Sequence, residues 1–422
     1  MEAADIAFVL ISAAMVMLMT PGLAFFYGGM VRVKSALNML MMSFISLGII
    51  SVLWVLYGFT LAFGSNYSDA DDGGIIGNLD FAGFQDITAE NGDILAFAVF
   101  QLMFAVLTPA LMSGALADRV KFTSWALFIT LWVTVVYFPV AHWVWAADGW
   151  LFGQEVIDFA GGTAVHINAG AGALAAVLVI GKRVGFKKEP MRPHNLPMVL
   201  LGAALLWFGW FGFNAGSALS PNGTAALMAL NTQVATAAAV LGWLAYERVR
   251  HGTFTTLGAA SGAIAGLVAI TPSGAHVTPL GAVLIGVVAG VLCAWAVSLK
   301  YKLGYDDSLD VVGVHLVGGL VGTLLVGFLA TDGIGGVEQF GKQALGAFSV
   351  LAYSFVVTYI LAQLLQRTIG FRASEEEEVA GLDLAYHAET GYDFTQTGTG
   401  SVPVNSVSAP AGAAAGEKKV DA

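Results

Sequence analysis

Residues 158–183 read Asp-Phe-Ala-Gly-Gly-Thr-Ala-Val-His-Ile-Asn-Ala-Gly-Ala-Gly-Ala-Leu-Ala-Ala-Val-Leu-Val-Ile-Gly-Lys-Arg, and the architecture follows from this segment. The segment predicts a membrane-spanning helix with a carboxylate, Asp158, at its start and one imidazole, His166, in its apolar body. Ionisable groups inside a bilayer are costly, and they usually mark a route for ions, protons or polar solutes. Gly162, His166 and Gly170 recur at intervals of four, which places the imidazole on a face of small residues that a second helix can approach.

Residues 310–324 repeat this design, and the second histidine follows the first by 149 residues. Asp310 stands at the start, His315 lies inside, and Gly319 and Gly322 share the face of the imidazole. Each histidine is roughly 6 Å from the start of its helix, because an α-helix rises about 1.5 Å per residue. If the helices start on opposite sides of the membrane, the imidazoles can meet only where both starts are recessed. The repeat therefore predicts two funnels that lead to a pair of histidines.

The composition is that of a polytopic membrane protein. Of the 422 residues, 57% are hydrophobic and 11% are charged, far outside the usual range for soluble domains. The net charge of -11 comes from acids in a few loops and the C-terminal tail, and it gives no nucleic-acid footprint. Cys293 is the only cysteine and lies in an apolar run, so we expect no disulfide, no metal cluster and no cofactor. The first residues lack the basic start of a signal peptide, so we expect the first apolar segment to be a mature helix.

Eleven apolar segments are long enough to span a bilayer. They cover residues 6–28, 39–64, 94–116, 123–147, 162–181, 196–217, 225–246, 254–271, 279–299, 311–330 and 344–366. Basic residues fall in alternate connections, with Lys342 as the exception, so the positive-inside rule predicts an external N-terminus and a cytoplasmic C-terminus. We therefore predict an all-α polytopic membrane protein with 11 transmembrane helices, in which helices 1–5 and 6–10 form a 5+5 inverted repeat and helix 11 braces the bundle.

The chain divides into three predicted parts. Residues 1–371 form the membrane domain, with a first repeat over about 6–181, a second over about 196–330 and helix 11 over about 344–366. Residues 372–394 form a charged cytoplasmic segment, and residues 395–422 have the composition of a disordered tail. The connection from Ser65 to Asp93 is the long external loop, because it carries acids and no base: Asp69, Asp71, Asp72, Asp80, Asp86, Glu90 and Asp93.

Several aromatic residues suggest a cation site at the outer end of the bundle. The candidates lie on helices 3, 4 and 6, and they are Phe100, Phe104, Trp145, Trp210 and Phe213, with Ser217 on the same stripe as the last two. Most aromatic residues in such a protein face lipid or the interface. Trp145, however, lies at the same end as Asp158. Ring faces, a hydroxyl and a nearby carboxylate would hold a small monovalent cation.

The two repeated histidines have a functional and a structural interpretation. A single histidine in a membrane helix is more often a hydrogen-bonded packing residue, and we expect His142 to be one. His166 and His315 differ because both have an acid at the helix start and a face of small residues. Two imidazoles that share a hydrogen bond can pass a proton by switching tautomers. A bis-histidine haem site is disfavoured, because glycines that bring the helices together leave little space for a macrocycle.

Four motifs in this order make the chain resemble the Amt/Mep/Rh family of ammonium transporters, on the bacterial Amt side. They are Thr-Pro-Gly-Leu-Ala-Phe-Phe-Tyr-Gly-Gly-Met-Val-Arg from Thr20, Asp-Phe-Ala-Gly-Gly-Thr-Ala-Val-His from Asp158, Trp-Phe-Gly-Phe-Asn-Ala-Gly-Ser from Trp210 and Asp-Val-Val-Gly-Val-His from Asp310. The resemblance covers about residues 6–394. It implies a multi-pass protein of the cell membrane that forms a homotrimer with one pore per subunit.

The resemblance also implies roles for the outer residues. It maps the external ammonium recruitment site onto Phe100, Trp145 and Ser217. It maps a stacked pair of phenylalanines that gates the pore onto Phe100 and Phe104. Asp158 matches the essential acid of the family, which we expect to orient the recruitment site. Deeper in the pore, the resemblance maps a lining tryptophan onto Trp210 and the paired pore histidines onto His166 and His315. We add Phe213 to the lining from its place on the same stripe as Trp210, and we expect the histidine pair to relay protons.

These residues predict a transporter and not an enzyme, since no nucleophile, metal cluster or nucleotide loop is evident. We expect ammonium to bind outside, lose its proton near Phe100 and Asp158, and pass the gate as ammonia, with the proton following separately so that uptake is electrogenic. The alternatives are an electroneutral ammonia or carbon dioxide channel and an ammonium sensor.

The segment from Ala380 is similar to the family segment that supports docking of a PII-type signalling protein, although Ala388 replaces a usual glycine. The alternative is a solvated acidic tail.

Overall fold

The computed structural model describes residues 1–67, 74–331 and 333–392. Within these ranges every regular element is helical, and the one β contact is an isolated antiparallel bridge between Val120 and Arg372. The prediction of an all-α fold is confirmed. The tail predicted at 395–422 lies outside the described residues, and so do three acids of the predicted external loop, Asp69, Asp71 and Asp72.

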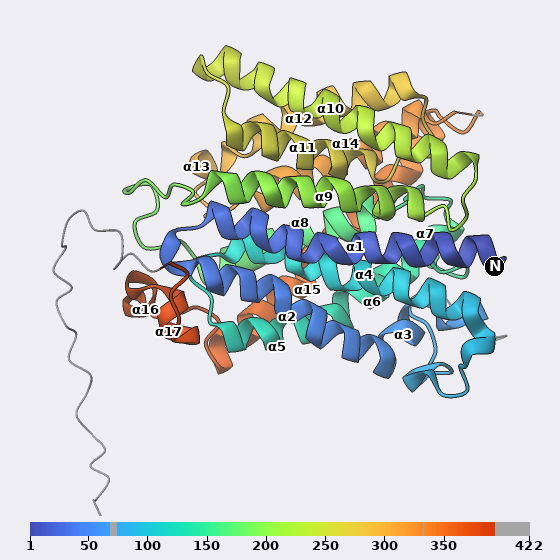
Figure 1. Cartoon of the computed structure of the whole chain (residues 1–422), viewed down its shortest axis with the longest axis horizontal. Coiled ribbons are helices and arrows are strands. Elements are labelled where there is room, and N and C mark those ends of the chain that lie inside the picture. Colours follow the sequence, from blue (N-terminus) through green and yellow to red (C-terminus); the bar gives the residue numbers. More distant parts are fainter. Residues whose placement is uncertain (68–73, 332, 393–422) are drawn as a thin grey trace, which may run out of the picture. The chain divides into compact units, whose positions relative to one another are not determined.

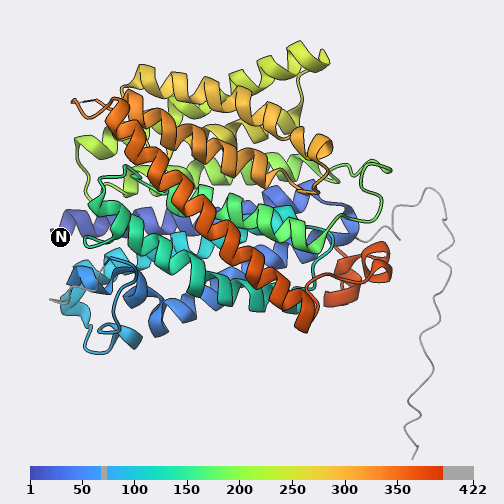
Figure 2. The same cartoon turned by 180° about the vertical axis from the view of Figure 1, so that it is seen from behind.

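The helices form one bundle (Figures 1 and 2). The longer helices are α1 (Ala3–Met30), α2 (Ala36–Leu53), α4 (Gly92–Leu116), α5 (Phe122–Trp132), α6 (Phe138–Trp145), α8 (Asn168–Ile180), α9 (Leu196–Gly216), α10 (Gly223–His251), α11 (Thr256–Ile270), α12 (Pro279–Ala296), α14 (Val317–Leu329) and α15 (Val337–Thr368). The short ones are α3 (Phe59–Phe63), α7 (Trp150–Gly153), α13 (Leu299–Leu303), α16 (Glu375–Ala380) and α17 (Leu382–His387).

Ten helical runs in the described ranges are long and apolar enough to cross a membrane. They correspond to ten of the eleven predicted segments. The remaining segment, predicted at 254–271, is the apolar helix α11 with 15 residues, whereas a full crossing requires roughly 20. The chain is thus a multi-pass membrane protein, and the number of crossings and the orientation of the termini stay predictions.

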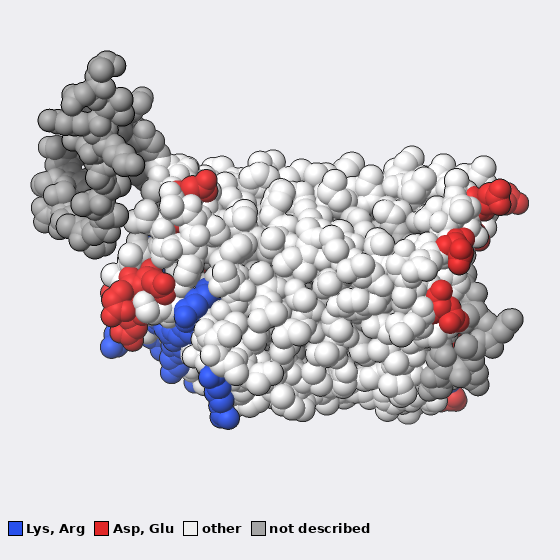
Figure 3. All heavy atoms as spheres, turned by 90° about the horizontal axis from the view of Figure 1, so that it is seen from below, with Lys and Arg blue, Asp and Glu red and all other residues white. Residues whose placement is uncertain are grey.

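Charged side chains gather at the two ends of the bundle (Figure 3). We call the end at which α1 begins the acidic end and the end at which α1 finishes, near Met30, the basic end. On the face in Figure 3, all visible Lys and Arg lie at the basic end, which also carries α16 and α17. The uncharged band between the ends is the surface that a bilayer would cover.

The helices that carry the two histidines begin with π-helical turns, η7 (Gly162–Ile167) and η8 (Val312–Leu316). Single π turns inside α-helices are frequent at functional sites. The sequence predicted ordinary helix at both places, because hydrophobic spacing over five residues does not separate the two forms. Two further π turns, η2 (Trp54–Gly58) and η6 (Val133–Tyr137), join α2 to α3 and α5 to α6.

Glycines bring the two histidine helices together in opposite directions. A Cβ added at Gly170 would lie 2.6 Å from the Leu316 backbone nitrogen, and one at Gly319 would lie 3.0 Å from the Gly162 carbonyl oxygen. Each helix therefore presents its later glycine to the start of the other, as an inverted repeat requires. The sequence placed Gly322 on the same face as Gly319. In the structure Gly322 instead faces Ala269 of α11.

Helix α15, the predicted bracing helix, contacts both ends of the first histidine helix. Gln343 of α15 accepts a hydrogen bond from the Ile157 backbone nitrogen at 2.7 Å and donates to the Ile157 carbonyl oxygen at 2.7 Å. About three turns further along α15, the Ser354 hydroxyl donates to the Asn168 carbonyl oxygen at 2.7 Å. These bonds fix the segment before Asp158 to a helix outside the repeat.

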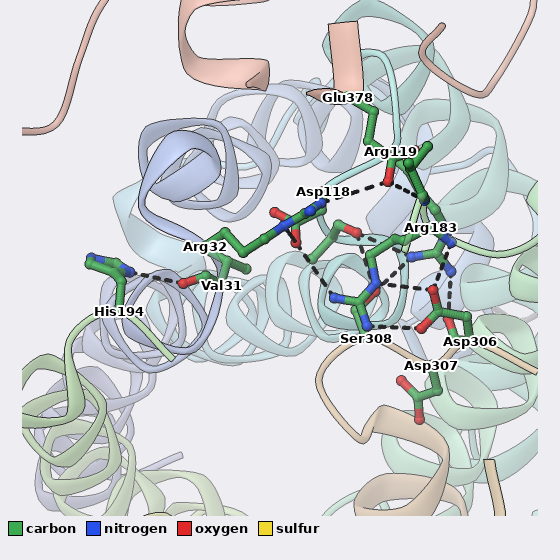
Figure 4. A network of polar contacts seen from close by, with 12 residues as sticks. Val31, Arg32, Asp118, Arg119, Arg183, His194, Asp306, Asp307, Ser308 and Glu378 are labelled. Atoms are coloured by element: carbon green, nitrogen blue, oxygen red, sulfur yellow. Dashed lines mark hydrogen bonds and ion pairs between the residues drawn. The ribbon is translucent and has the colours of Figure 1, made fainter. Parts of the chain in front are cut away.

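A buried polar network closes the basic end (Figure 4). Its centre is the fully buried Arg119, whose guanidinium donates to the carbonyl oxygens of Ala115, Ala117, Gly181 and Asp306 and to the Ser308 hydroxyl. One side chain thereby ties the end of α4 to the end of α8 and to the segment before η8. A buried guanidinium is stable only where its donors are satisfied, and all three of its nitrogens have partners here.

Ion pairs extend this network. Arg183 binds the Asp306 carboxylate at 2.8 and 3.0 Å and approaches Asp118 at 3.5 Å, and Asp118 also pairs with Arg32 at 3.0 Å. Burial alone would raise the pKa of Asp306, but the hydrogen bond from Arg183 and the charges of Arg119 and Arg183 outweigh burial and lower it. The ionised form of this carboxylate is therefore the one that the folded chain stabilises.

The C-terminal segment joins the same network through Glu378 of α16. Its buried carboxylate accepts from the Val184 backbone nitrogen at 2.7 Å and from Arg372 at 3.0 Å, and lies 3.6 Å from Arg32. In α17, Asp383 accepts from the first backbone nitrogens of α2, those of Leu37 and Asn38, at 3.0 and 2.7 Å. The described part of the segment is thus anchored at two points.

Ala388, which the sequence flagged as an alanine in place of a glycine, follows α17 with φ 54°. This left-handed conformation is costly for residues with a Cβ. The structure therefore explains why a glycine is favourable at this position.

Candidate functional site

The site begins with a small cavity of about 130 Å³ at the acidic end. Its lining comes from α4, α6, the segment before η7 and the end of α9, and consists of Phe97, Phe100, Gln101, Phe104, Trp145, Phe159, Ser217 and Leu219. The structure thus brings together the three residues predicted for a recruitment site, Phe100, Trp145 and Ser217. We call this cavity the outer pocket.

The polar groups of the outer pocket are oriented so that acceptors face its interior. The Trp145 indole N–H donates to the Asp158 carbonyl oxygen at 2.9 Å, so the indole offers the pocket its ring and not its donor. The Ser217 hydroxyl donates to the Phe213 carbonyl oxygen at 2.8 Å, which leaves its lone pairs to accept from a ligand. The buried Gln101 Oε1 has no hydrogen-bond partner and adds a second acceptor.

Asp158 lies behind the outer pocket and acts on it through other groups. Its Oδ1 accepts from the backbone nitrogens of Gly161 and Gly162, and its Oδ2 accepts from those of Thr163 and Ala164 and from the Thr163 hydroxyl. Both oxygens are therefore fully engaged with the first turn of the His166 helix. The expectation that Asp158 orients the site agrees with this geometry, whereas direct contact with a cation does not.

The aromatic pair below the outer pocket differs from the predicted one. Phe100 and Phe104, expected to be stacked, meet edge to face, with ring centroids 5.0 Å apart and planes at 65°. Phe104 instead lies nearly face to face with Phe213, at 4.2 Å and 32°. Phe100 and Phe104 both come from α4, whereas Phe213 comes from α9. Phe100 and Phe104 are therefore not stacked as expected, and Phe104 pairs with Phe213 instead, while the gating role stays a prediction.

Below this pair lie the two histidines. Their Nδ1 atoms are 3.3 Å apart, and the ring centroids are separated by 5.3 Å. Both residues are buried, and His166 Nε2 has no hydrogen-bond partner. A shared Nδ1 proton makes one imidazole an Nε2 acceptor and the other an Nε2–H donor. A buried polar nitrogen without a partner is costly, so His166 Nε2, an acceptor or an N–H donor according to the tautomer, is available to a small polar molecule.

Trp210 and Phe213, which were predicted to line the pore, both lie against His166. The Trp210 ring stacks on His166 at 5.5 Å, and its indole N–H donates to the Thr271 hydroxyl at 2.9 Å. The Phe213 ring also stacks on the His166 imidazole, with ring centroids 6.1 Å apart. With the edge contact of Trp145 and Phe104 at 5.7 Å, ring contacts are continuous from the outer pocket to the histidine pair.

The second repeat uses a different aspartate from the one the sequence indicated. Asp307 accepts from the Val311 and Val312 backbone nitrogens at 3.1 and 2.8 Å, so it caps η8 as Asp158 caps η7. Asp310 instead pairs with Lys300 at 2.6 Å. The spacing could have shown this, because Asp158 and Asp307 each precede their histidine by eight residues. Burial raises the pKa of the Asp307 carboxyl above its ordinary value.

Sequence reasoning missed four residues of the outer pocket: Phe97, Gln101, Phe159 and Leu219. Phe159 stands directly after Asp158 in the motif, and Gln101 follows Phe100 on α4. Phe159 was detectable from its place in the motif. Gln101 was detectable because it is an amide in an apolar helix. No group of three or more His, Cys, Asp or Glu in the described ranges could hold a metal ion.

Fold and site together define a multi-pass helical membrane protein in which ring contacts connect an aromatic pocket to a pair of buried histidines. Comparison with known proteins gives the family. The profile of the Ammonium Transporter Family matches residues 7–392, and the chain belongs to that family. It is a family of transporters and not of enzymes.

Individual relatives agree with this assignment. The chain is 55% identical to an ammonium transporter of Mycobacterium tuberculosis, over 95% of this chain and 92% of the relative. It is 44% identical to an ammonium transporter of Bacillus subtilis, over 93% and 99%. Among solved structures, it is similar to a Sensor Amt Protein, with a TM-score of 0.85 and 32% identity over 90% of this chain and 98% of the other. Saccharomyces cerevisiae Mep2 is also similar, with a TM-score of 0.82 and 36% identity over 89% and 91%.

Proposed function

We propose that the chain takes up ammonium by binding the cation in the outer pocket, removing its proton there, and conducting ammonia past Phe104 and Phe213 to the histidine pair. One observation carries the proposal. The ring contacts from Trp145 to His166 lead from a pocket with acceptors to a buried imidazole nitrogen without a partner. Family membership supports ammonium as the transported species.

The outer pocket suits an ammonium ion in size and in polarity. The ion has donors in every direction, and the pocket presents the Ser217 hydroxyl oxygen and Gln101 Oε1 as acceptors. The Trp145 ring adds cation-π attraction, worth about 0.5–2 kcal/mol. The indole N–H of Trp145 is engaged with the Asp158 carbonyl oxygen, so it is not offered to an anion in the pocket.

Ammonium loses its proton in the outer pocket, before it reaches the rings of Phe104 and Phe213. Phe104 and Phe213 are 1% and 0% exposed, and an intact cation between two apolar rings would lose its hydration shell without replacement. Ammonia carries no charge and passes at far lower cost. The Asp158 oxygens are all engaged, so we assign the acceptor role to water in the pocket and keep Asp158 as the group that holds Trp145 and the helix start.

The released proton then follows separately through the imidazole pair. Ammonia accepts at an Nε2–H or donates to the opposite Nε2, and transfer along the 3.3 Å Nδ1 contact exchanges the two tautomers. Net charge would therefore cross with each ammonia, which makes uptake electrogenic. Potassium would be rejected because it has no proton to give up.

Currents from proteoliposomes on a solid-supported membrane test the proposal. An ammonium pulse should evoke a transient current that a potassium pulse does not. Ser217→Ala should raise the half-saturating ammonium concentration by at least about tenfold, since a hydrogen bond to a charged group contributes about 1.5–3 kcal/mol. Ser46→Ala is the matched control, because its hydroxyl also donates to a backbone carbonyl within its own helix but lies outside the pocket. Equal behaviour of the two variants would contradict recruitment at Ser217.

A second variant separates the electrogenic mechanism from a gas channel. His166→Ala should keep ammonia uptake, measured by internal alkalinisation, and lose the current. If wild type equilibrates ammonia faster than empty liposomes and gives no current, the chain is an electroneutral channel and the proton relay is wrong.

A sensor is the second candidate function, because a Sensor Amt Protein is among the similar structures. A sensor would bind ammonium in the same pocket without flux. Saturable ammonium binding by calorimetry, together with neither current nor alkalinisation in proteoliposomes, would favour it.

Assembly and regulation also belong to this proposal. We infer a homotrimer and a cytoplasmic PII-type partner from the family resemblance and from the anchored segment that contains α16 and α17. Native mass spectrometry measures the subunit number. Pull-down with a PII-type protein, using the full chain and a chain ending at Arg372, tests the partner.

A further inference from the structure

Three polar side chains of α15 bind the segment that follows α7. Lys342 is the exception to the alternation of basic connections in the sequence, and its ammonium pairs with the Glu155 carboxylate at 2.6 Å. Gln339 donates to the Glu155 carbonyl oxygen at 3.0 Å. Gln343 accepts from the Ile157 backbone nitrogen and donates to the Ile157 carbonyl oxygen, both at 2.7 Å. Helix α15 crosses the outside of the bundle (Figure 2), so a helix outside the predicted repeat holds this segment.

The side-chain amide of Gln343 uses its full hydrogen-bonding capacity. Its Oε1 accepts from the Ile157 nitrogen and from Gln339 Nε2, the latter at 3.2 Å. Its Nε2 donates to the carbonyl oxygens of Ile157 and Thr323, the latter at 3.1 Å. A primary amide offers two lone pairs and two N–H groups, so all four are engaged. The side chain is 0% exposed, and a buried amide with every bond satisfied holds its partners rigidly.

Ile157 is joined directly to groups that form the outer pocket. Consecutive Cα atoms are about 3.8 Å apart, and Ile157 is followed at once by Asp158 and Phe159. The Asp158 carbonyl oxygen is the acceptor for the Trp145 indole, and Phe159 lines the pocket itself. A shift of Ile157 would therefore move both the acceptor that orients the Trp145 ring and one wall of the cavity.

The second repeat has a different tie at the matching position. The Asp307 carbonyl oxygen, which corresponds to that of Asp158, accepts from the Lys300 ammonium at 2.8 Å. Within the described ranges, no side chain of α15 bonds to residues 303–307. The contacts of α15 with the start of a histidine helix are therefore specific to the end at which we propose that ammonium binds.

We propose that Gln343 is a positioning residue for ammonium recruitment, an inference that rests on the proposed function. Its amide holds the segment before Asp158, so that the Trp145 ring and Phe159 form the outer pocket before the cation arrives. Gln343 itself does not line the pocket. Loss of the amide should therefore weaken binding of ammonium and leave the maximal rate of conduction unchanged.

Ammonium-evoked currents from proteoliposomes measure the half-saturating concentration and the maximal current separately. Gln343→Met retains an unbranched side chain of similar size and removes all four hydrogen bonds. It should raise the half-saturating concentration by about threefold to tenfold and leave the maximal current unchanged. Gln339→Met should have a smaller effect, because Gln339 bonds to the chain two residues earlier. Gln363→Met is the matched control, since Gln363 donates to Tyr359 of its own helix.

Hydrogen–deuterium exchange of the same samples measures how firmly the segment is held. Gln343→Met should speed exchange of the backbone amides in peptides that cover 155–161. Peptides that cover 305–312 should exchange as in wild type, which distinguishes local loosening from misfolding. If Gln343→Met does not fold, Gln339→Met is judged by the same two measurements, because it leaves the Gln343 side chain in place.

Three results would overturn the inference. Unchanged exchange at 155–161 would mean that Gln343 does not hold the segment. Faster exchange with an unchanged half-saturating concentration would make the contact purely structural. A lower maximal current with an unchanged half-saturating concentration would place the effect on conduction.

Ser217→Ala in the same assay separates this inference from the proposed function. If Ser217→Ala raises the half-saturating concentration and Gln343→Met does not, recruitment in the outer pocket stands and only the role of Gln343 is wrong. If neither variant changes it, recruitment in the outer pocket is wrong, and the role of Gln343 is wrong with it.

Discussion

Replacing Asp158 by asparagine tests whether this carboxylate acts as a structural cap. Each oxygen of the carboxylate accepts from at least two backbone N–H groups, Gly161 and Gly162 on one side and Thr163 and Ala164 on the other. An amide has one acceptor oxygen and one NH2 donor. In either orientation, the NH2 of asparagine would face two N–H donors.

The structure gives the size of the effect. At least two hydrogen bonds to a charged group would be lost, each worth about 1.5–3 kcal/mol, so Asp158→Asn should reduce the free energy of unfolding by about 3–6 kcal/mol. Asp307→Asn should cost about half as much, because each oxygen of Asp307 accepts from one backbone N–H. Asp93→Asn is the control, since Asp93 is 49% exposed and its one ion pair is 4.0 Å long.

Thermal unfolding of the purified variants in one detergent measures the order of stability, and proteoliposome currents measure transport on the same samples. We expect Asp158→Asn to be the least stable, Asp307→Asn intermediate, and Asp93→Asn equal to wild type. If Asp158→Asn melts like the Asp93 control and still loses transport, the carboxylate acts chemically on the cation and the cap argument is wrong.

Other changes have equally specific outcomes. Phe213→Ala should admit potassium, measured as a potassium-evoked current that Phe100→Leu does not produce, because Phe213 supplies the ring opposite Phe104. Ala388→Gly should stabilise the anchored C-terminal segment by about 1 kcal/mol, seen as slower proteolysis there, because φ is 54° at this position. The pKa of Asp306 is lowered in the folded chain. The contribution of its carboxylate to the free energy of unfolding should therefore be complete above the ordinary aspartate pKa of about 3.9, and it should be lost as the pH falls through the pKa of Asp306 in the folded chain. Melting curves from pH 7 to pH 3 should therefore differ between wild type and Asp306→Asn at the upper end and converge at the lower end.

The bundle was predictable because membrane insertion leaves a strong one-dimensional signal. Length and apolar composition located the helices, and the repeated Asp-to-His segments located the pair now seen with 3.3 Å between nitrogens. Glycine spacing predicted the close approach that Gly170 makes to Leu316. These features depend on residues that are neighbours along one helix, which a sequence displays directly.

The pairing of Phe104 with Phe213 was not predicted, because this contact is formed between helices. Spacing on α4 relates Phe100 to Phe104, but nothing in that spacing reveals that Phe213 of α9 lies opposite. The sequence indicated Asp310 as the acid at the start of the second histidine helix, and this was wrong. The acid that accepts from the first backbone nitrogens of this helix is Asp307, which lies several residues before η8. Hydrogen bonds of side chains to distant backbone, such as those of Gln343 to Ile157, leave no periodic signal at all.

The opposed directions of the two histidine helices have a consequence for energetics. A pore whose centre is built from two inverted halves does not itself set a direction of transport. The direction of net movement is set by the ammonium gradient and the membrane potential. If one charge accompanies each ammonia, a potential of 100 mV supplies about 2.3 kcal/mol, which corresponds to roughly 50-fold accumulation at equilibrium. The asymmetric outer pocket can change how quickly that limit is reached from each side, but it cannot move the limit.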